Sequence, residues 1–305
     1  MIPEGGASRP PLFRLPFGPM AVATLTFADR LAAEVERKRS QLVVGLDPNP
    51  DLLPVELRGD VARFCCGIVD AVAPYAVAVK PQLAFFEALG PRGMSAFDQV
   101  CAYARRAGLL VIADGKRGDV GSTARAYAEA YLEGDPPRAD ALTVNPWLGR
   151  DAIEPFLGAV RRGGVGIFVL VRTSNAGGDV QDAVLKDGRP VWQHVAGLVE
   201  EWGEESTGEV GLSSVGAVVG ATHPRAVADA RRLMPRTILL LPGVGAQGGS
   251  VADLGRAFQS GPASALVAAS RSVIYAYRES GADFREAAGA EASRLQREVW
   301  SASGW

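Results

Sequence analysis

Eight short apolar runs, rich in β-branched residues, alternate with longer amphipathic stretches along this chain of 305 residues. The runs cover residues 41–47, 75–80, 109–114, 141–145, 166–171, 215–220, 237–241 and 265–269. Continuous apolar runs, unlike alternating ones, are typical of strands that are buried on both faces of a parallel sheet. Eight strand–helix units in about 265 residues match the size of a (β/α)₈ barrel. We therefore predict an α/β fold, a (β/α)₈ TIM barrel.

The domain boundaries follow from the same pattern. Nothing in residues 25–305 resembles a Pro/Ser-rich linker, so we predict one domain there, and the glycine-rich insertion 175–189 is predicted to be a mobile loop over the active face. Residues 1–24 are predicted to be a flexible extension, because their five prolines forbid a regular helix. Thr26 and Asp29 then have the spacing of a capping box, which predicts a helix through Arg39.

Composition excludes several classes of protein. The net charge of −2 gives no electrostatic reason to expect binding to nucleic acid or to an anionic membrane. The apolar part of residues 17–27 is too short and interrupted to span a membrane. Three cysteines make no disulfide framework and no C-x-x-C metal spacing, so we predict no metal site and a cytoplasmic protein.

Charged residues follow the third apolar run, in the hexapeptide Asp114-Gly-Lys-Arg-Gly-Asp119. Alternate side chains of a strand share a face, so Asp114 and Lys116 are expected on one face, with Asp119 in the loop that follows. Charges in such a place are costly to bury unless they are paired. The hexapeptide alone leaves two interpretations open, a structural ion pair and a functional site.

The other predicted strands favour the functional interpretation, because chemistry in such barrels lies at the carboxyl ends of the strands. Polar side chains follow all of these ends except the glycine-rich seventh: Asp47, Lys80, Asp114 with Lys116, Asn145, Thr173 with Ser174, Thr222 with His223, and Ser270 with Arg271. Buried structural pairs would have no reason to collect at one end of the sheet.

The seventh end, Gly243-Val-Gly-Ala-Gln-Gly248, formally matches the G-x-G-x-x-G pattern of dinucleotide sites. That pattern needs an acidic residue about 20 positions on, and the region 265–271 has none. A phosphate site formed by the loops after strands seven and eight fits better, with backbone N–H groups and Arg271 as ligands. A plain tight turn with a solvated arginine remains the alternative.

Together these residues resemble the orotidine 5′-phosphate decarboxylase family, in its longer bacterial branch. The stretch from Asp114 to Thr123 resembles the family's D-x-K-x-x-D-[IV]-x-x-T signature. Its other blocks are matched in order by Gly45-Leu-Asp-Pro48, Val79-Lys-Pro-Gln82, Thr143-Val-Asn-Pro146, Thr173-Ser-Asn175, Pro242-Gly-Val-Gly-Ala-Gln247 and Ser270-Arg-Ser-Val-Ile-Tyr275. Gly115 and Arg172 depart from the family's commoner alanine and lysine, and both side-chain positions are expected to point away from the site.

The resemblance implies roles for particular residues. Lys80, Asp114, Lys116 and Asp119 resemble the catalytic charged tetrad, with Lys116 as the proton donor. Asp119 and Thr123 are implied to reach the neighbouring subunit's site, which implies a homodimer with shared active sites. The implied substrate contacts are Asp47 and Lys80 at the ribose, Ser174 at the pyrimidine ring, Gln247 and Arg271 at the phosphate, and also Pro242 and Ser270.

The implied reaction converts orotidine 5′-phosphate to UMP and CO₂ in pyrimidine biosynthesis, without a cofactor. Two alternatives stay open: a related barrel aldolase or sugar-phosphate synthase using Lys116 or Mg²⁺, and a non-catalytic nucleotide-binding barrel. A Ser/His/Asp hydrolase is not supported, because the chain has only His194, predicted on a helix surface, and His223, predicted to be structural.

Overall fold

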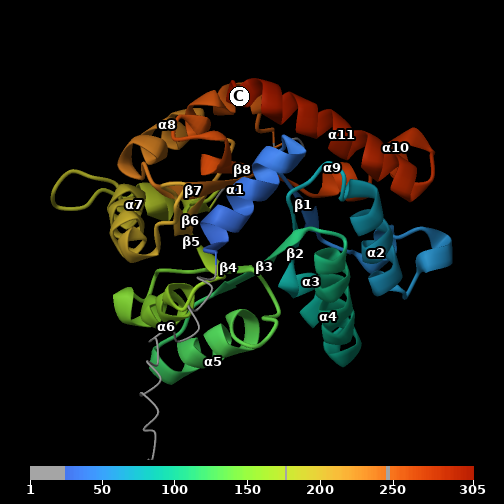
Figure 1. Cartoon of the computed structure of the whole chain (residues 1–305), viewed down its shortest axis with the longest axis horizontal. Helices are drawn as coiled ribbons and strands as arrows, with labels where there is room; N and C mark the ends of the chain where they lie inside the picture. Colours follow the sequence, from blue (N-terminus) through green and yellow to red (C-terminus); the bar gives the residue numbers. More distant parts are fainter. Residues whose placement is uncertain (1–24, 176, 245–247) are drawn as a thin grey trace, which may run out of the picture.

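The computed structural model describes residues 25–175, 177–244 and 248–305. Its strands form one closed barrel in which each strand pairs in parallel with its neighbours in sequence, and β8 closes against β1 (Figure 1). The strands are β1 (Leu42–Leu46), β2 (Ala78–Pro81), β3 (Leu110–Arg117), β4 (Ala141–Val144), β5 (Gly166–Arg172), β6 (Ser213–Val219), β7 (Thr237–Pro242) and β8 (Ala265–Ala269). The predicted TIM barrel and its eight strands are therefore confirmed.

The strand residues are buried almost throughout, as their continuous apolar runs predict. Side chains that point inward, such as Val43, Ile112 and Phe168, fill the barrel with an inner core. Their outward neighbours, such as Val44 and Val111, join the larger core between the sheet and the helices. The barrel interior is thus packed rather than hollow, and a ligand can enter only at an end.

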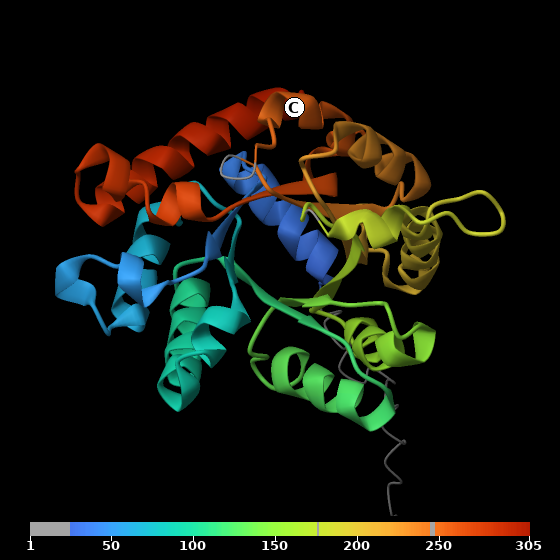
Figure 2. The same cartoon turned by 180° about the vertical axis from the view of Figure 1, so that it is seen from behind.

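Helices surround the barrel and connect successive strands (Figure 2). The α-helices are α1 (Phe27–Lys38), α2 (Val61–Val72), α3 (Leu83–Glu87), α4 (Gly90–Arg106), α5 (Gly121–Leu132), α6 (Arg150–Arg161), α7 (Val191–Trp202), α8 (Pro224–Leu233), α9 (Arg271–Ile274), α10 (Tyr277–Ser280) and α11 (Phe284–Ser303). The 3₁₀ segments are η1 (Pro50–Leu52), η2 (Val55–Leu57), η3 (Gly178–Asp182), η4 (Glu204–Ser206), η5 (Val251–Phe258) and η6 (Pro262–Ser264). After β7 the ring is completed by η5.

Helix α1 closes the amino-terminal mouth of the barrel (Figure 1). It begins as predicted, because the Thr26 hydroxyl accepts a hydrogen bond from the Asp29 backbone N–H at 3.1 Å. Its buried face packs into the inner core, where Phe27 meets Phe168 edge to face with ring centroids 6.0 Å apart. With this mouth covered, the carboxyl ends of the strands form the accessible end.

The end of β3 differs from the sequence-based prediction, and the predicted extension is not tested. Strand β3 continues to Arg117, beyond the predicted end at Asp114, and its pairing with β4 shifts register between Ala113 and Arg117. The predicted extension, residues 1–24, lies outside the described residues, so its separation from a domain at 25–305 stays a prediction. Among the described helices, none is long and apolar enough to cross a membrane.

Candidate active site

A cavity of about 620 Å³ lies at the carboxyl ends of the strands. Eight of the predicted site residues line it: Asp47, Lys80, Asp114, Lys116, Ser174, Pro242, Ser270 and Arg271. They come from the ends of β1, β2, β3, β5, β7 and β8, and therefore converge only because the barrel closes. The structure thus brings these eight residues together in one cavity, and the roles predicted for them stay predictions.

Asp114 is the centre of the charged group. Its Oδ2 accepts a hydrogen bond from Lys80 Nζ at 2.6 Å, and its Oδ1 accepts one from Lys116 Nζ at 2.6 Å. Asp114 and Lys80 are buried, whereas the Lys116 side chain is 45% exposed. One carboxylate thus holds two ammonium groups at the wall of the cavity, and the more accessible ammonium is that of Lys116.

The pairing changes the protonation equilibria of the buried members. Burial by itself would raise the pKa of Asp114, but the charges of Lys80 and Lys116 outweigh it and hold that pKa well below its usual value. Burial by itself would lower the pKa of Lys80, but Asp114 and Asp47 outweigh it and raise that pKa. Asp114 is therefore an anion and Lys80 a cation at neutral pH.

The side of the cavity where ribose contacts are predicted is formed by the ends of β1 and β8. Asp47 lines it, and the Oδ1 atom of Asp47 is buried without a hydrogen-bond partner among the described residues. Ser270 lies against Gly45, where a Cβ atom would come within 2.7 Å of the serine Cβ, so only glycine permits this approach. A buried acceptor with spare capacity fits a ligand hydroxyl that donates to it.

The segment that follows β5 is hydrogen-bonded to the last residue of that strand and to Thr173. Arg172 donates two hydrogen bonds to the Asp182 carboxylate, at 3.0 and 2.7 Å. Gln181 accepts from the Thr173 backbone N–H at 2.8 Å and donates to its hydroxyl at 2.9 Å. Ser174 is thereby held between β5 and the η3 segment.

Two further observations concern the wall of the cavity near Ser174. Gly220 of the β6 end accommodates Ser174, because a Cβ there would lie 2.8 Å from the serine Cβ. Gln181 itself lines the cavity. Of the predicted loop after β5, Asn175 and Gln181 therefore border the cavity, and residues 178–182 form the η3 helix. Its mobility and its place over the active face stay predictions.

Arg271, the first residue of α9, is the predicted phosphate ligand that the structure describes, and Pro242, the last residue of β7, also lines the cavity. Gln247, the other implied phosphate ligand, lies outside the described residues. Gly243, which has no side chain, also lines the cavity with its backbone. The described part of this side thus presents one guanidinium group and backbone to a ligand, as an anion site requires.

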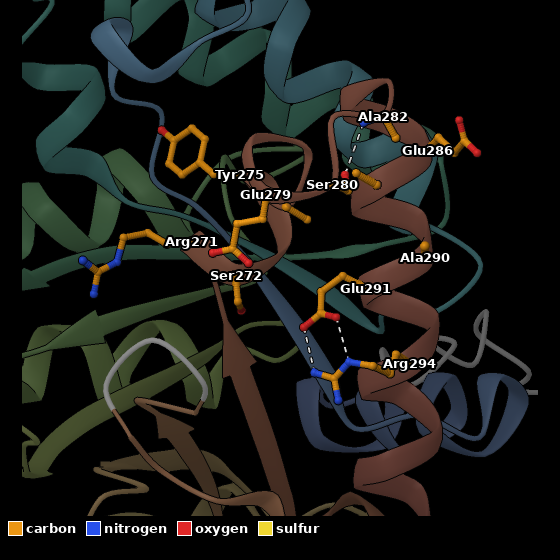
Figure 3. A pocket seen from close by; sticks show the side chains of 12 residues that line it. Arg271, Ser272, Tyr275, Glu279, Ser280, Ala282, Glu286, Ala290, Glu291 and Arg294 are labelled. Atoms are coloured by element: carbon orange, nitrogen blue, oxygen red, sulfur yellow. Dashed lines mark hydrogen bonds and ion pairs between the residues drawn. The ribbon is translucent and has the colours of Figure 1, made fainter.

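Arg271 also borders a second hollow, of about 630 Å³, between α9–α10 and α11. Figure 3 shows its side chain extending away from α11, while Glu291 and Arg294 of α11 bond to each other at 2.8 Å. Arg271 is the one predicted site residue among the described side chains that line this hollow. The hollow is therefore not part of the candidate site.

Asp119 and Thr123 are the predicted site residues that this chain does not bring to its own cavity. Asp119 accepts a hydrogen bond from the Val120 backbone N–H next to it, at 2.7 Å, and Thr123 is exposed on the first turn of α5. Neither is among the described residues that line the cavity. The single chain therefore assembles three members of the predicted tetrad.

Sequence reasoning missed several cavity-lining residues, including Gln82, Phe85, Thr143 and Gln181. Thr143 lies in a matched block, and its spacing two residues before Asn145 on a strand could have indicated an inward side chain. Gln181 had no such signal, because loop residues follow no periodicity. Among the residues that the structure describes, no group of three or more His, Cys, Asp or Glu side chains is placed to hold a metal ion.

Comparison of the sequence and the fold with known proteins identifies the family of this chain. Residues 40–285 match the model of the orotidine 5′-phosphate decarboxylase / HUMPS family. The orotidine 5′-phosphate decarboxylase of Rhodopirellula baltica is 47% identical over 271 residues, covering 83% of this chain and 90% of that protein. The enzyme of that name from Deinococcus radiodurans is 49% identical over 257 residues, with the same coverage. The OMP decarboxylase structure from Leishmania donovani superposes with a TM-score of 0.73 at 30% identity, covering 92% of this chain and all of that one. The chain belongs to the orotidine 5′-phosphate decarboxylase / HUMPS family.

Proposed function

We propose that this protein converts orotidine 5′-phosphate to UMP and CO₂, with amino-acid side chains and no cofactor as its catalytic groups. The observation that supports it most directly is the Lys80–Asp114–Lys116 group, with both contacts at 2.6 Å, in a cavity that also contains Arg271. The family match and the relatives' names support the same reaction.

In this reaction the bond between C6 of the pyrimidine and the carboxylate carbon breaks, and its electron pair stays on C6. The resulting carbanion has little resonance stabilisation, so the enzyme must lower the barrier by on the order of 20 kcal/mol. Fixed charges in a site that excludes water are the largest means available to a protein. We assign Lys116 to stabilise the charge at C6 and then to protonate it.

The surroundings of Lys116 suit that assignment. Its ammonium group is held by Asp114, and its 45% exposed side chain allows it to regain a proton from water after each turnover. Asp114 faces the departing carboxylate and disfavours the ground state by charge repulsion. CO₂ leaves as a neutral molecule, which relieves that repulsion.

The remaining cavity residues are assigned to substrate binding. Asp47 and Lys80 contact the ribose hydroxyls, and Ser174 contacts the pyrimidine ring. Arg271 binds the phosphate. Pro242, Ser270 and Gln247 complete the contacts, with Gln247 on the phosphate. Binding energy from the remote phosphate then holds the base in register with Lys116.

We further propose a cytoplasmic homodimer in which Asp119 and Thr123 serve the neighbouring subunit's cavity. In the described chain neither is among the residues that line the cavity. Next to them, Val120 is 54% exposed and Trp147 is 72% exposed, on loops that lie close together where Gly118 approaches Asn145. Exposed apolar side chains of this kind are typical of a protein interface.

The test is an assay of purified protein with orotidine 5′-phosphate, following the loss of absorbance as UMP forms. The wild type should turn over, and Lys116→Ala should abolish turnover while UMP binding stays measurable. Lys186→Ala, in the exposed part of the loop after β5, is the matched lysine control and should keep full activity. Near-normal turnover by Lys116→Ala would refute the mechanism, and an inactive wild type would refute the function.

A further inference from the structure

The backbone of Lys116 has an unusual conformation. Its φ is +46°, and among the described non-glycine residues only Arg39, at a helix end, shares a positive φ. A side chain with a Cβ atom rarely adopts this left-handed region, and within a strand it is disfavoured further. Such a conformation persists at a site only where surrounding contacts hold it.

The strand pairing shows where those contacts are needed. The β3–β4 ladder runs regularly to Ala113, shifts register, and resumes at Arg117. The residues between, which include Asp114 and Lys116, therefore lie in an irregular segment that the ladder itself does not hold.

Thr143 of β4 fills this gap in the ladder. Its hydroxyl accepts a hydrogen bond from the Lys116 backbone N–H at 2.9 Å and donates one to Asp114 Oδ1 at 2.9 Å. The residue is 1% exposed and lines the cavity. One hydroxyl thus joins the backbone of the proposed proton donor to the carboxylate that holds its ammonium group.

We propose that Thr143 is a positioning residue for the decarboxylation, an inference that rests on the function proposed above. Its hydroxyl keeps Lys116 in the left-handed conformation and fixes the rotamer of Asp114, so that the Lys116 ammonium is held where C6 will be protonated. Serine can make both hydrogen bonds. Valine, which has the same shape as threonine, can make neither.

The experiment compares Thr143→Val and Thr143→Ser with the wild type. In Thr143→Val, kcat should fall about 10- to 100-fold, since misplacing a catalytic group by about 1 Å costs this much. The Kd for UMP should change less than about threefold, because the proposed phosphate and ribose contacts are elsewhere. Thr143→Ser should restore kcat to within about threefold of the wild type.

Thr237→Val is the matched control. Thr237 is also a fully buried barrel threonine whose hydroxyl donates to a carboxylate, that of Glu200 at 2.8 Å, but it lies at the amino-terminal end of β7. This variant loses a comparable hydrogen bond away from the cavity. It should be destabilised to a similar extent as Thr143→Val while keeping the wild-type kcat.

Crystal structures of the variants give a readout that does not depend on activity. Thr143→Val should show Lys116 out of the left-handed region or its Nζ withdrawn from Asp114, and Thr143→Ser should show neither. An unchanged Lys116 in Thr143→Val, an unchanged kcat in that variant, or a Thr143→Ser as impaired as Thr143→Val would overturn the inference. An inactive wild type would instead refute the proposed function, and the structures would still decide whether the hydroxyl holds Lys116.

Discussion

At the scale of single residues, the charges around Asp114 contribute to stability as well as to chemistry. A carboxyl group whose pKa is lowered on folding adds stability above its unfolded pKa, about 4, and loses it as the pH falls through the folded value. A lysine whose pKa is raised, as for Lys80, adds stability below its unfolded pKa of about 10.4 and loses it as the pH rises through the folded value. Both contributions are therefore present across the neutral range.

Asp114→Asn should test this. Removing the anion leaves the Lys80 ammonium buried without its partner, so the free energy of unfolding at pH 7 should fall by about 3 kcal/mol. The difference from the wild type should shrink as the pH falls below about 4, because the wild-type carboxyl is then protonated in the unfolded chain while it stays ionised in the folded one. Urea unfolding at several pH values measures both effects.

The control is Asp98→Asn. Its carboxylate is 46% exposed and pairs with Arg138 at 3.3 Å on the surface, so its loss should cost less than about 1 kcal/mol. If Asp114→Asn were no more destabilising than this control, the buried pairs would not stabilise the fold.

Arg271→Ala tests the phosphate side at the same scale. Losing a charged, two-pronged contact should raise the Kd for UMP about 10- to 100-fold, from the usual strength of charge-assisted hydrogen bonds. The melting temperature should hardly change, because the side chain is exposed. Calorimetric titration measures the affinity, and Arg278→Ala, an exposed arginine of α10, should bind UMP normally. An affinity for UMP that does not change in Arg271→Ala would exclude the phosphate role.

At the scale of the elements, the sequence predicts strands better than the segments that join them. A buried strand leaves a continuous apolar run, and Thr26 marks the start of α1, because both signals are local. The extension of β3 to Arg117 has no local signal, since its pairing there and the Lys116 hydrogen bond are both to residues of the neighbouring strand. For the same reason the positive φ of Lys116 could not be predicted.

Arg172 shows a second limit of local reasoning. It was expected to point away from the site, and the structure agrees, since its guanidinium is bonded to Asp182 and is not among the described groups lining the cavity. Its partner is ten residues away in a segment that has no periodicity, so the bond itself was not foreseen. The bond matters because it ties the η3 segment to the strand that carries Ser174.

Asp182→Ala should therefore loosen this segment. The buried Arg172 guanidinium loses its two-pronged partner, so proteases should cut residues 175–189 faster, and the Kd for UMP should rise about fivefold, equivalent to about 1 kcal/mol. Asp179→Ala is the matched control, because Asp179 lies on the same η3 helix and is exposed, with its carboxylate accepting from the adjacent Val180 N–H. Equal protease sensitivity of the two variants would show that the Arg172–Asp182 pair does not hold the segment.

At the scale of the whole molecule, barrel closure turns residues that are far apart in sequence into one site. Asp47 and Arg271 lie 224 positions apart, yet both line the cavity because β8 pairs with β1. Each strand end can be recognised from sequence, so the convergence of Lys80, Asp114 and Ser174 was predictable. The destination of Asp119 is implied only by the family resemblance, because the strand pattern of one chain does not reveal which subunit's cavity receives a side chain.

Mixing two inactive variants decides that question. Lys116→Ala lacks the proposed proton donor but keeps Asp119. Asp119→Asn lacks the Asp119 carboxylate but keeps Lys116. If Asp119 serves the neighbouring cavity, a hybrid dimer contains one cavity with both groups intact. Random reassociation of equal amounts makes half of the dimers hybrids, so the mixture should recover about a quarter of the wild-type activity. Each variant alone should stay inactive, and differently tagged chains measure how many hybrids form. If hybrids form and the mixture remains inactive, Asp119 acts in the cavity of its own chain, and the proposal of shared active sites is wrong.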